Sequence, residues 1–424
     1  MKDRKGPGIT GWILIGLVAG IVVGGAQYQF LPASLNAALI KYVHDPVGRV
    51  FLNGIRLLVV PLVLVSLTLG TARIGHLSKI GRIGGRIILL YIGTTACAIT
   101  IGYGLAWLVR PGSGLSIPTD AAFQGAAAPN MLDFLVNIVP INPIESLASG
   151  NMLQIIFFSL LCGIAISSLQ EKTKKLVSAL DVVDQVIQKM VGLIMLFAPI
   201  GVFGLMAKVV AGQGGAVFLP LLKYMFTIIG ALIIQGIIVY PSILRLFARL
   251  NPLQFYRNIS PAMLVAFTTS SSNATLPVTL QTAKDRLGVH ESVGAFTLSL
   301  GATLNMDGTA IMQGVATVFI AGVYDIPLHA SAFFTVVLMA TLASIGTAGV
   351  PGVGLIMLSM VLRQIGLPIE GIGIILGVDR LLDMSRTMIN VCGDLACTAV
   401  VAQKEGEFDE HVFNSPNEPW KSPM

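Results

Sequence analysis

Six long apolar runs dominate the first 250 residues of this chain. They are Gly8–Ala26, Val50–Leu69, Ile87–Leu108, Met152–Leu169, Val191–Val210 and Ala216–Phe247. Each is near or above the ~20 residues that a helix needs to cross the hydrocarbon core of a bilayer. The whole chain is 54% hydrophobic and only 11% charged, whereas soluble domains carry about 25% charged residues. The sequence therefore predicts an all-α polytopic membrane protein.

Basic residues gather in alternate links between these runs. The links that are rich in Lys and Arg are 73–86, 172–175, 245–257 and 284–286, while 41–49, 110–133 and 211–215 are poorer. Short basic links stay on the cytoplasmic side of a membrane, so we expect a cytoplasmic N-terminus. This bias accounts for the net charge of +6, and nothing else favours a nucleic-acid partner. The acidic tail 405–424 is expected to be a solvated cytoplasmic end.

Two segments of the second half combine small and polar residues with apolar arms. They are Thr268–Pro277 and Ala343–Gly354, and each has a proline at or near the end of its polar stretch. The arms are too short for two full crossings, and proline disfavours helix continuation. We therefore predict two re-entrant helical hairpins whose tips meet in mid-membrane, as in an inverted repeat with a binding site at its interface. Ordinary loops between short spans are the alternative.

Between these hairpins, Gly301–Thr309 interrupts the apolar segment Ala295–Val323. Asn, Asp and Gly close together disfavour an unbroken helix. An unwound turn would free carbonyl oxygens beside the Asp307 carboxylate, and such oxygens suit a monovalent cation. The alternative is a kinked helix in which Asp307 pairs with a basic residue, but none lies in this segment.

The last apolar segment carries an unusual stripe of polar side chains. At 100° per residue its members fall within an arc of about 80° on one helix face; they are Asp379, Asp383, Arg386, Asn390 and Asp394. A charge at the centre of a bilayer costs roughly 3 kcal/mol or more. Three carboxylates and a guanidinium on one intramembrane face therefore predict a site for an ion and a solute.

Other classes of function fit the residues less well. A channel would repeat its pore residues by symmetry across subunits, whereas an Arg and an Asp one turn apart suit occlusion of a zwitterion. An intramembrane hydrolase would need an activated nucleophile. The run Ser270–Ser272 could suggest one, but we expect all five histidines (His44, His76, His290, His329, His411) to lie in loops or outside the core. We therefore expect a protein that is not an enzyme.

These motifs together resemble the glutamate transporter family of dicarboxylate/amino acid:cation symporters. The resemblance rests on the tip Ser270–Pro277, the motif Asn305–Thr309, the tip Gly346–Gly354 and the helix from Asp383 to Asp394, in that order. It implies eight transmembrane helices, two re-entrant hairpins, inverted repeats, a homotrimer and elevator-type transport.

The resemblance also divides the chain. Residues 1–250 would be mostly scaffold and trimer contact, with helix 87–108 contributing to the transport domain. Residues 251–404 would form the transport core. Its parts are the first hairpin 257–284, the broken helix 291–323, the second hairpin 328–366 and the last helix 370–404.

The resemblance implies import of L-aspartate or L-glutamate. Arg386 would bind the side-chain carboxylate in a bidentate manner, and Asp383 would pair with the amino group. Asn390 and Ser272 would hold the α-carboxylate. The full set of implied substrate-binding residues is Ser270, Ser271, Ser272, Thr309, Val350, Gly354, Asp383, Arg386, Thr387 and Asn390.

Na⁺ is the coupling ion that the resemblance implies, at three sites. The first comprises Gly301, Asn305, Asn390 and Asp394; the second Thr303, Met306, Ser344, Ile345 and Thr347; the third Tyr91, Thr94, Thr95, Asn305 and Asp307. Alone, the polar patch at Tyr91–Thr95 is typical of hydrogen bonding between helices.

Two departures from the family keep alternatives open. Relatives place a second arginine where this chain has Ser270 or Met384, whereas here the extra arginine is Arg380, which lies off the stripe and could pair with Asp379 or a neighbouring helix. Asn273 replaces a serine of the first tip. Coupling to H⁺, or transport of C4-dicarboxylates, are the alternative functions. We expect an inner membrane location in a bacterium or archaeon, with both termini cytoplasmic and lipid and the homotrimer as partners.

Overall fold

The computed structural model describes residues 9–75, 81–115, 136, 138–344, 349 and 352–414. All regular elements in this part of the chain are helical, and the only β-type pairing among these residues is an isolated bridge between Val289 and Phe408. The predicted all-α class is therefore confirmed. Within the described ranges, five helical stretches are long and apolar enough to cross a membrane, namely Gly11–Phe30, Ala33–Ala72, Arg82–Val109, Ala198–Ala248 and Glu291–Val323. A bent pair within 154–195 would make a sixth.

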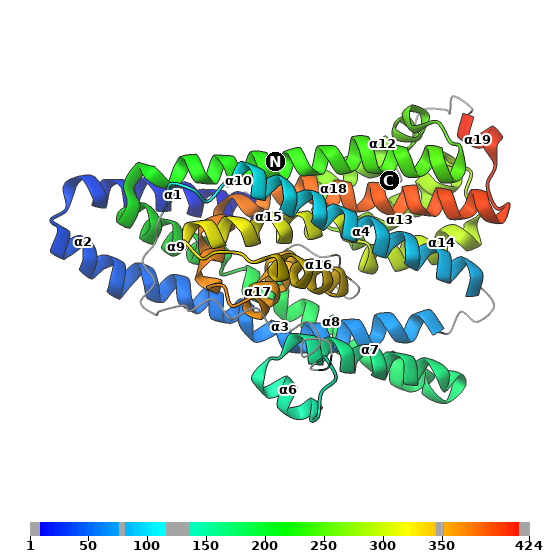
Figure 1. Ribbon diagram of the computed structural model, residues 1–424, viewed down its shortest axis with the longest axis horizontal. Helices are drawn as coiled ribbons and strands as arrows, with labels where there is room; N and C mark the ends of the chain where they lie inside the picture. Colours follow the sequence, from blue (N-terminus) through cyan, green and yellow to red (C-terminus); the bar gives the residue numbers. More distant parts are fainter. Residues whose placement is uncertain are drawn as a thin grey trace, which may run out of the picture.

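The first half of the chain forms long helices joined by short π or 3₁₀ turns (Figure 1). Its elements are α1 (Ile9–Phe30), α2 (Ala33–Leu39), η1 (Ile40–His44), α3 (Asp45–Gly75), α4 (Gly81–Val109), α6 (Pro143–Ser149), α7 (Met152–Ser168), η3 (Gln170–Thr173), α8 (Lys174–Met195), α9 (Ala198–Gln213), η4 (Gly214–Val217), α10 (Phe218–Ile234), η5 (Gln235–Val239), α11 (Tyr240–Ile243) and η6 (Leu244–Ala248).

Two expectations for this half were wrong. The apolar run Val191–Val210 is not one span, because α8 ends at Met195 and α9 begins at Ala198 with Pro199 in its first turn. Proline suits the first turn of a helix, where its missing N–H costs nothing. His44 does not lie in a loop: η1 continues α2 into α3, and the buried imidazole lies 3.1 Å from the side-chain oxygen of Gln27.

The second half contains paired helices and one long final helix. Its elements are α12 (Pro252–Thr269), α13 (Ser272–Asp285), α14 (Glu291–Leu304), α15 (Asp307–Val323), α16 (Ala330–Ser344), α17 (Val353–Gln364), η7 (Ile369–Gly371), α18 (Ile372–Glu405) and α19 (Glu410–Asn414). Helix α12 begins at Pro252, where the Asn251 side chain caps the helix by accepting from the Leu253 amide at 2.9 Å. Between α14 and α15, Asn305 and Met306 leave the helical conformation.

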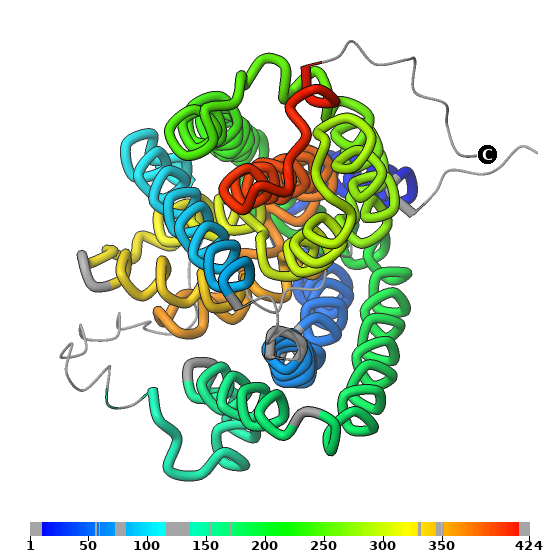
Figure 2. Tube along the Cα trace, turned by 90° about the vertical axis from the view of Figure 1, so that its right-hand side faces the viewer, coloured from blue at the N-terminus to red at the C-terminus, as the bar shows by residue number. Residues whose placement is uncertain are grey.

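Helix α18 lies inside the bundle (Figures 1 and 2). It packs against α4, α10, α12, α14 and α15, whereas α7 and α8 pack on α3 at the opposite edge of the molecule. Residues 389–402 of α18 are all buried. Of the predicted polar stripe, Asp379, Arg386, Asn390 and Asp394 are therefore buried in protein, and Asp383 is partly buried.

Candidate functional site

Arg386 lies at the centre of an ion-pair cluster on α18. Its Nη1 is 2.6 Å from Oδ1 of Asp379, and its Nη2 is 2.8 Å from Oδ1 of Asp383. The side chains of Arg386 and Asp379 are 1% and 7% exposed, so this pair is held almost entirely out of solvent. Among the described residues the Nε of Arg386 is buried without a hydrogen-bond partner. The guanidinium thus keeps one donor for a further acceptor.

Arg380 joins the same cluster. Its guanidinium lies 3.5 Å from Oδ2 of Asp383, three residues further along the helix. This contact follows from the helix, because side chains three apart are neighbours on one face. The pairing of Arg380 with Asp379 stays a prediction. Two arginines and two aspartates make this cluster formally neutral, and Asp383 is shared between both guanidinium groups.

Asn390 connects α18 to the break between α14 and α15. Its Oδ1 accepts from the Gly308 amide at 2.7 Å, and its Nδ2 lies 3.2 Å from Sδ of Met306. A Cβ added at Gly308 would lie 2.4 Å from the Arg386 carbonyl oxygen, so the backbones of α15 and α18 touch here. Glycine is required at residue 308 for this close approach.

Asp394 closes the other side of the break. Its Oδ1 accepts from Nδ2 of Asn305 at 2.9 Å. A Cβ at Gly301 would lie 2.6 Å from that same oxygen and 2.6 Å from the Tyr91 hydroxyl. The members of the first predicted cation site, which are Gly301, Asn305, Asn390 and Asp394, are thereby brought together.

Asp307 is fully buried at the start of α15 and has no basic partner among the described residues. Its Oδ1 accepts from the Thr95 hydroxyl at 2.8 Å and lies 3.3 Å from that of Thr94, which is also 3.2 Å from Oδ1 of Asn305. Two residues of the third predicted site, Thr94 and Thr95, therefore contact this carboxylate, and a third, Asn305, is linked to it through Thr94. The hydroxyl of Tyr91, its fourth predicted partner, donates to the Thr297 carbonyl at 2.9 Å.

Sequence reasoning missed two residues at Asp307. The side-chain amide of Gln235 donates to Oδ2 at 3.0 Å, and the Tyr240 hydroxyl lies 2.8 Å from the same oxygen. Gln235 is the first residue of η5 and Tyr240 the first residue of α11, both in the first half of the chain, and both are 0% exposed. The available signal was Gln235 itself, the one amide in the apolar run Ala216–Phe247, five residues before Tyr240.

Ser344, at the end of α16, links the second hairpin to the break. Its hydroxyl donates to the Leu304 carbonyl at 2.6 Å and accepts from the Met306 amide at 3.3 Å. Thr303, the residue before Leu304, donates its hydroxyl to the Leu300 carbonyl at 3.0 Å. Ile345 and Thr347, also predicted for the second cation site, and Val350 of the substrate site lie outside the described residues.

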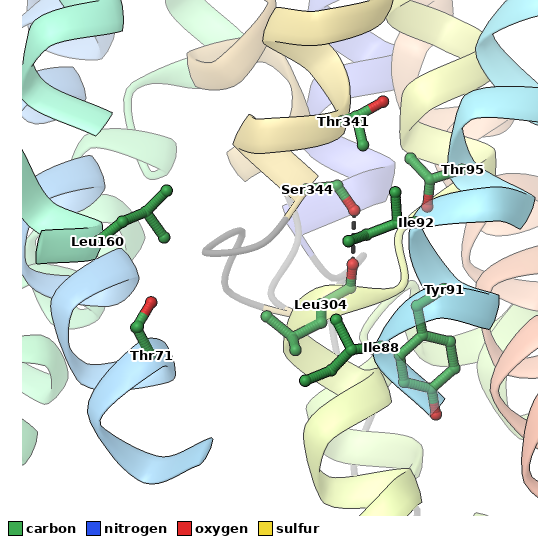
Figure 3. Close-up of a pocket in the computed structure, with 9 residues that line it drawn as sticks. All are labelled: Thr71, Ile88, Tyr91, Ile92, Thr95, Leu160, Leu304, Thr341 and Ser344. Carbon is green, nitrogen blue, oxygen red and sulfur yellow. Dashed lines mark hydrogen bonds between the residues drawn. The ribbon is translucent and has the colours of Figure 1, made fainter. Parts of the chain in front are cut away.

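A cavity of about 130 Å³ adjoins this region (Figure 3). In Figure 3, Ser344 and Leu304 are joined by their hydrogen bond, with Thr95 and Tyr91 of α4 on the neighbouring wall. The cavity is lined by Thr71, Ile88, Tyr91, Ile92, Thr95, Leu160, Leu304, Thr341 and Ser344. Helices α3 and α7 therefore meet the core across it.

The two hairpin tips contact each other. The Ser271 hydroxyl donates to the Gly349 carbonyl at 2.6 Å, and the backbone amide of Asn273 donates to the same oxygen at 3.1 Å. Ser271 also caps α13 by accepting from the Ala274 amide at 3.2 Å. Ser270 is buried with a left-handed backbone (φ 52°), and its hydroxyl has no partner in the described part of the chain. The tips therefore meet as the sequence predicted.

Of the remaining predicted substrate residues, Ser272, Thr309 and Thr387 are buried and Gly354 is half-buried. Ser272 is the first residue of α13, Thr309 lies in the first turn of α15, and Thr387 follows Arg386 on α18. A Cβ at Gly354 would lie 3.1 Å from Cγ2 of Thr309, which places the start of α17 against α15. The tips, the break and the α18 stripe thus form one enclosed region.

Gly301→Ala is expected to lower the thermal unfolding temperature. The added methyl group would overlap both the Asp394 carboxylate and the Tyr91 hydroxyl, and such overpacking costs about 1–3 kcal/mol. Gly93→Ala is the matched control, because no atom lies within 4 Å of a Cβ there and alanine favours a helix. Unfolding of the detergent-purified proteins measures both; equal transition temperatures for the two variants would contradict this packing.

A bundle of apolar helices around an enclosed site of buried charges, hairpin tips and a broken helix defines a multi-pass membrane transporter. Residues 9–404 match the profile of the sodium:dicarboxylate symporter family, and this chain belongs to that family. The family and its members below are transporters rather than enzymes.

Three relatives show how far the similarity extends. The chain is 32% identical to the proton/sodium-glutamate symport protein of Geobacillus stearothermophilus, over 95% of this chain and 96% of that protein. It is 32% identical to the proton/glutamate-aspartate symporter of Escherichia coli, over 94% of this chain and 93% of the relative. The C4-dicarboxylate transport protein of Bacillus subtilis is also 32% identical, over 86% and 88% of the two chains.

Proposed function

We propose that this protein imports L-aspartate and L-glutamate by symport with cations, and that Na⁺ is the coupling ion. The observation that carries the proposal is the buried Arg386 beside Asp383 on α18, the helix that α13 and α17 of the two hairpins contact. A guanidinium and a carboxylate one turn apart match a zwitterion that carries an extra carboxylate. Relatives named as glutamate and glutamate-aspartate symporters support the same substrate class.

In this proposal Arg386 binds the side-chain carboxylate of the substrate and Asp383 its amino group. The Nε of Arg386 has no partner among the described residues, so the guanidinium has a donor for the incoming carboxylate. Asp379 remains as the buried counter-charge, which keeps Arg386 oriented when no substrate is bound. Asn390 and Ser272 hold the α-carboxylate, close to the N-terminus of α13, whose partial positive charge favours an anion.

Na⁺ is proposed to bind as cargo at the break between α14 and α15. Oxygen ligands at Asn305, Asp307 and Asp394 lie on the two sides of this break, and the threonine hydroxyls of α4 complete the set around Asp307. Hard cations prefer such carboxylate, amide and hydroxyl oxygens. Binding there would neutralise buried carboxylates that have no basic partner within the described residues.

The same proposal extends to assembly and movement. We propose a homotrimer in the inner membrane with both termini cytoplasmic, in which residues 1–250 are mainly scaffold and residues 251–404 move as the transport core in an elevator-type cycle. The Lys and Arg bias of the links supports the orientation. The arrangement of eight transmembrane helices and two re-entrant hairpins rests on the family resemblance.

Transport of C4-dicarboxylates is a second candidate function. The contact of Arg380 with Asp383 favours it, because a carboxylate shared by two guanidinium groups attracts a substrate ammonium less strongly. A relative named as a C4-dicarboxylate transport protein is as similar as the symporters above.

Uptake of radiolabelled aspartate, glutamate and succinate into proteoliposomes tests the proposal, with Na⁺ and H⁺ gradients imposed separately. An inward Na⁺ gradient is expected to drive accumulation of both amino acids, and an H⁺ gradient alone is not. Accumulation driven only by H⁺ would overturn Na⁺ coupling. Uptake of succinate but of neither amino acid would establish the second candidate function instead.

A further inference from the structure

The turn η5 has a π-helical backbone, and this turn determines where Gln235 and Tyr240 point. The Tyr240 amide donates to the Gln235 carbonyl, five residues earlier. In an unbroken α-helix two residues five apart point about 140° away from each other. In a π turn, which bonds residue i to residue i+5, they lie on nearly the same side. Both side chains can therefore reach Oδ2 of Asp307.

The local sequence explains the π turn. Residue 241 is proline, which has no N–H and whose ring crowds the carbonyl four residues earlier. Since the Tyr240 amide is used by Gln235, the Gly236 carbonyl lacks a backbone donor at both i+4 and i+5. The Tyr256 hydroxyl, from α12, donates to this carbonyl. The π register is thus supported by a side chain from the neighbouring hairpin.

Each oxygen of the Asp307 carboxylate accepts from its own pair of donors. Gln235 and Tyr240 hold Oδ2 from the α10–α11 side. Oδ1 faces the α4 hydroxyls of Thr94 and Thr95. Because Gln235 and Tyr240 are neutral, they orient the carboxylate without cancelling its charge.

We propose that Gln235 and Tyr240 are positioning residues for the coupled cation, which they serve by fixing Asp307 through the π turn. This inference rests on the proposed function, since it takes Asp307 as a ligand of the transported cation. Groups that orient a metal-binding side chain typically change its affinity for the ion 10–100-fold, as a rough range. The two residues add η5 and α11 to the elements that build the cation site.

Tyr240 also connects the cation site to α18. Its hydroxyl lies 3.1 Å from the Ile389 carbonyl as well as 2.8 Å from Asp307. A phenol has one proton, so it donates to one of these acceptors at a time. The residue after Ile389 is Asn390, which holds the break from the other side. Loss of the hydroxyl therefore removes a contact between the carboxylate and the substrate-binding helix.

The test uses the full-length protein in proteoliposomes, with Na⁺ and radiolabelled aspartate as probes. Tyr240→Phe and Gln235→Met each remove one hydrogen-bonding group with little change in volume. We expect the Na⁺ concentration for half-maximal uptake to rise at least about tenfold in each. The KM for aspartate at saturating Na⁺ should stay near that of the unsubstituted protein, because the Arg386 cluster is untouched.

Tyr224→Phe is the matched control for Tyr240→Phe. Tyr224 is also fully buried on α10, but its hydroxyl has no hydrogen-bond partner among the described residues. We expect it to leave the Na⁺ dependence unchanged. The same half-maximal Na⁺ concentration in Tyr240→Phe and Tyr224→Phe would overturn the inference. A parallel rise of the half-maximal Na⁺ concentration and of the KM for aspartate in Tyr240→Phe and Gln235→Met would also overturn it.

Failure of the proposed function would give a different result from failure of this inference. If the unsubstituted protein takes up aspartate without any dependence on Na⁺, cation coupling by Na⁺ is wrong. If the unsubstituted protein depends on Na⁺ and Asp307→Asn shifts that dependence while Tyr240→Phe and Gln235→Met do not, the cation site stands and the positioning role is overturned.

Discussion

Arg386→Ala is expected to reduce uptake of aspartate and glutamate below detection. The guanidinium is the buried group proposed to bind the substrate's second carboxylate, and removing one partner of a desolvated, hydrogen-bonded charge pair costs about 2–5 kcal/mol. Uptake into proteoliposomes, normalised to the amount of reconstituted protein, measures the loss. Undiminished uptake of acidic amino acids would show that another residue binds that carboxylate.

A second variant separates recognition from folding. Arg386→Ala leaves Asp379 and Asp383 buried without this counter-charge, and such a change destabilises a protein by about 3–5 kcal/mol. Arg386→Lys keeps the positive charge but cannot bind a carboxylate in a bidentate manner. We expect Arg386→Lys to elute from size exclusion like the unsubstituted protein and still to lose most of its uptake. Normal uptake by Arg386→Lys would mean that charge alone suffices.

Asp307→Asn and Asp394→Asn are each expected to raise the Na⁺ concentration for half-maximal uptake at least about tenfold. Each substitution removes a negative charge from the break between α14 and α15 while keeping the shape of the side chain. The measurement is the Na⁺ concentration for half-maximal uptake of aspartate. Unchanged Na⁺ dependence in both variants would exclude these carboxylates as cation ligands.

Asp184→Asn is the matched control for these two variants. Asp184 is also a buried carboxylate in a helix, and its hydrogen-bond partners among the described side chains are neutral: it accepts from Ser66 at 2.7 Å and from Gln188 at 2.5 Å. It lies on α8, which packs against α3 rather than in the core around α18. We expect Asp184→Asn to leave the Na⁺ dependence unchanged, because the cation site does not include it.

The sequence predicted those features that depend on local pattern. Helix periodicity placed Asp379, Asp383 and Arg386 on one face, and the structure joins them in one ion-pair cluster. Asn and Gly beside Asp307 indicated the helix break, and the polar tips indicated contact between the hairpins. Each of these signals lies within a window of a few turns, where residue type decides the backbone conformation.

The features that were missed depend on contacts between distant segments. Arg380 was not assigned to Asp383, because the choice depends on which oxygen Arg386 occupies. Gln235 and Tyr240 were not assigned to the site, since periodicity of an α-helix places them on different faces and only the π turn brings them together. Their common partner, Asp307, is more than sixty residues away along the chain.

The touching backbones at Gly308 and Arg386 have a mechanical consequence. Two helices that meet without an intervening side chain, and that are also tied by Asn390, cannot slide past one another without losing that fit. Any displacement of the guanidinium across the bilayer must then carry the helix break with it. If solute and ion bind where we propose, they would therefore move together.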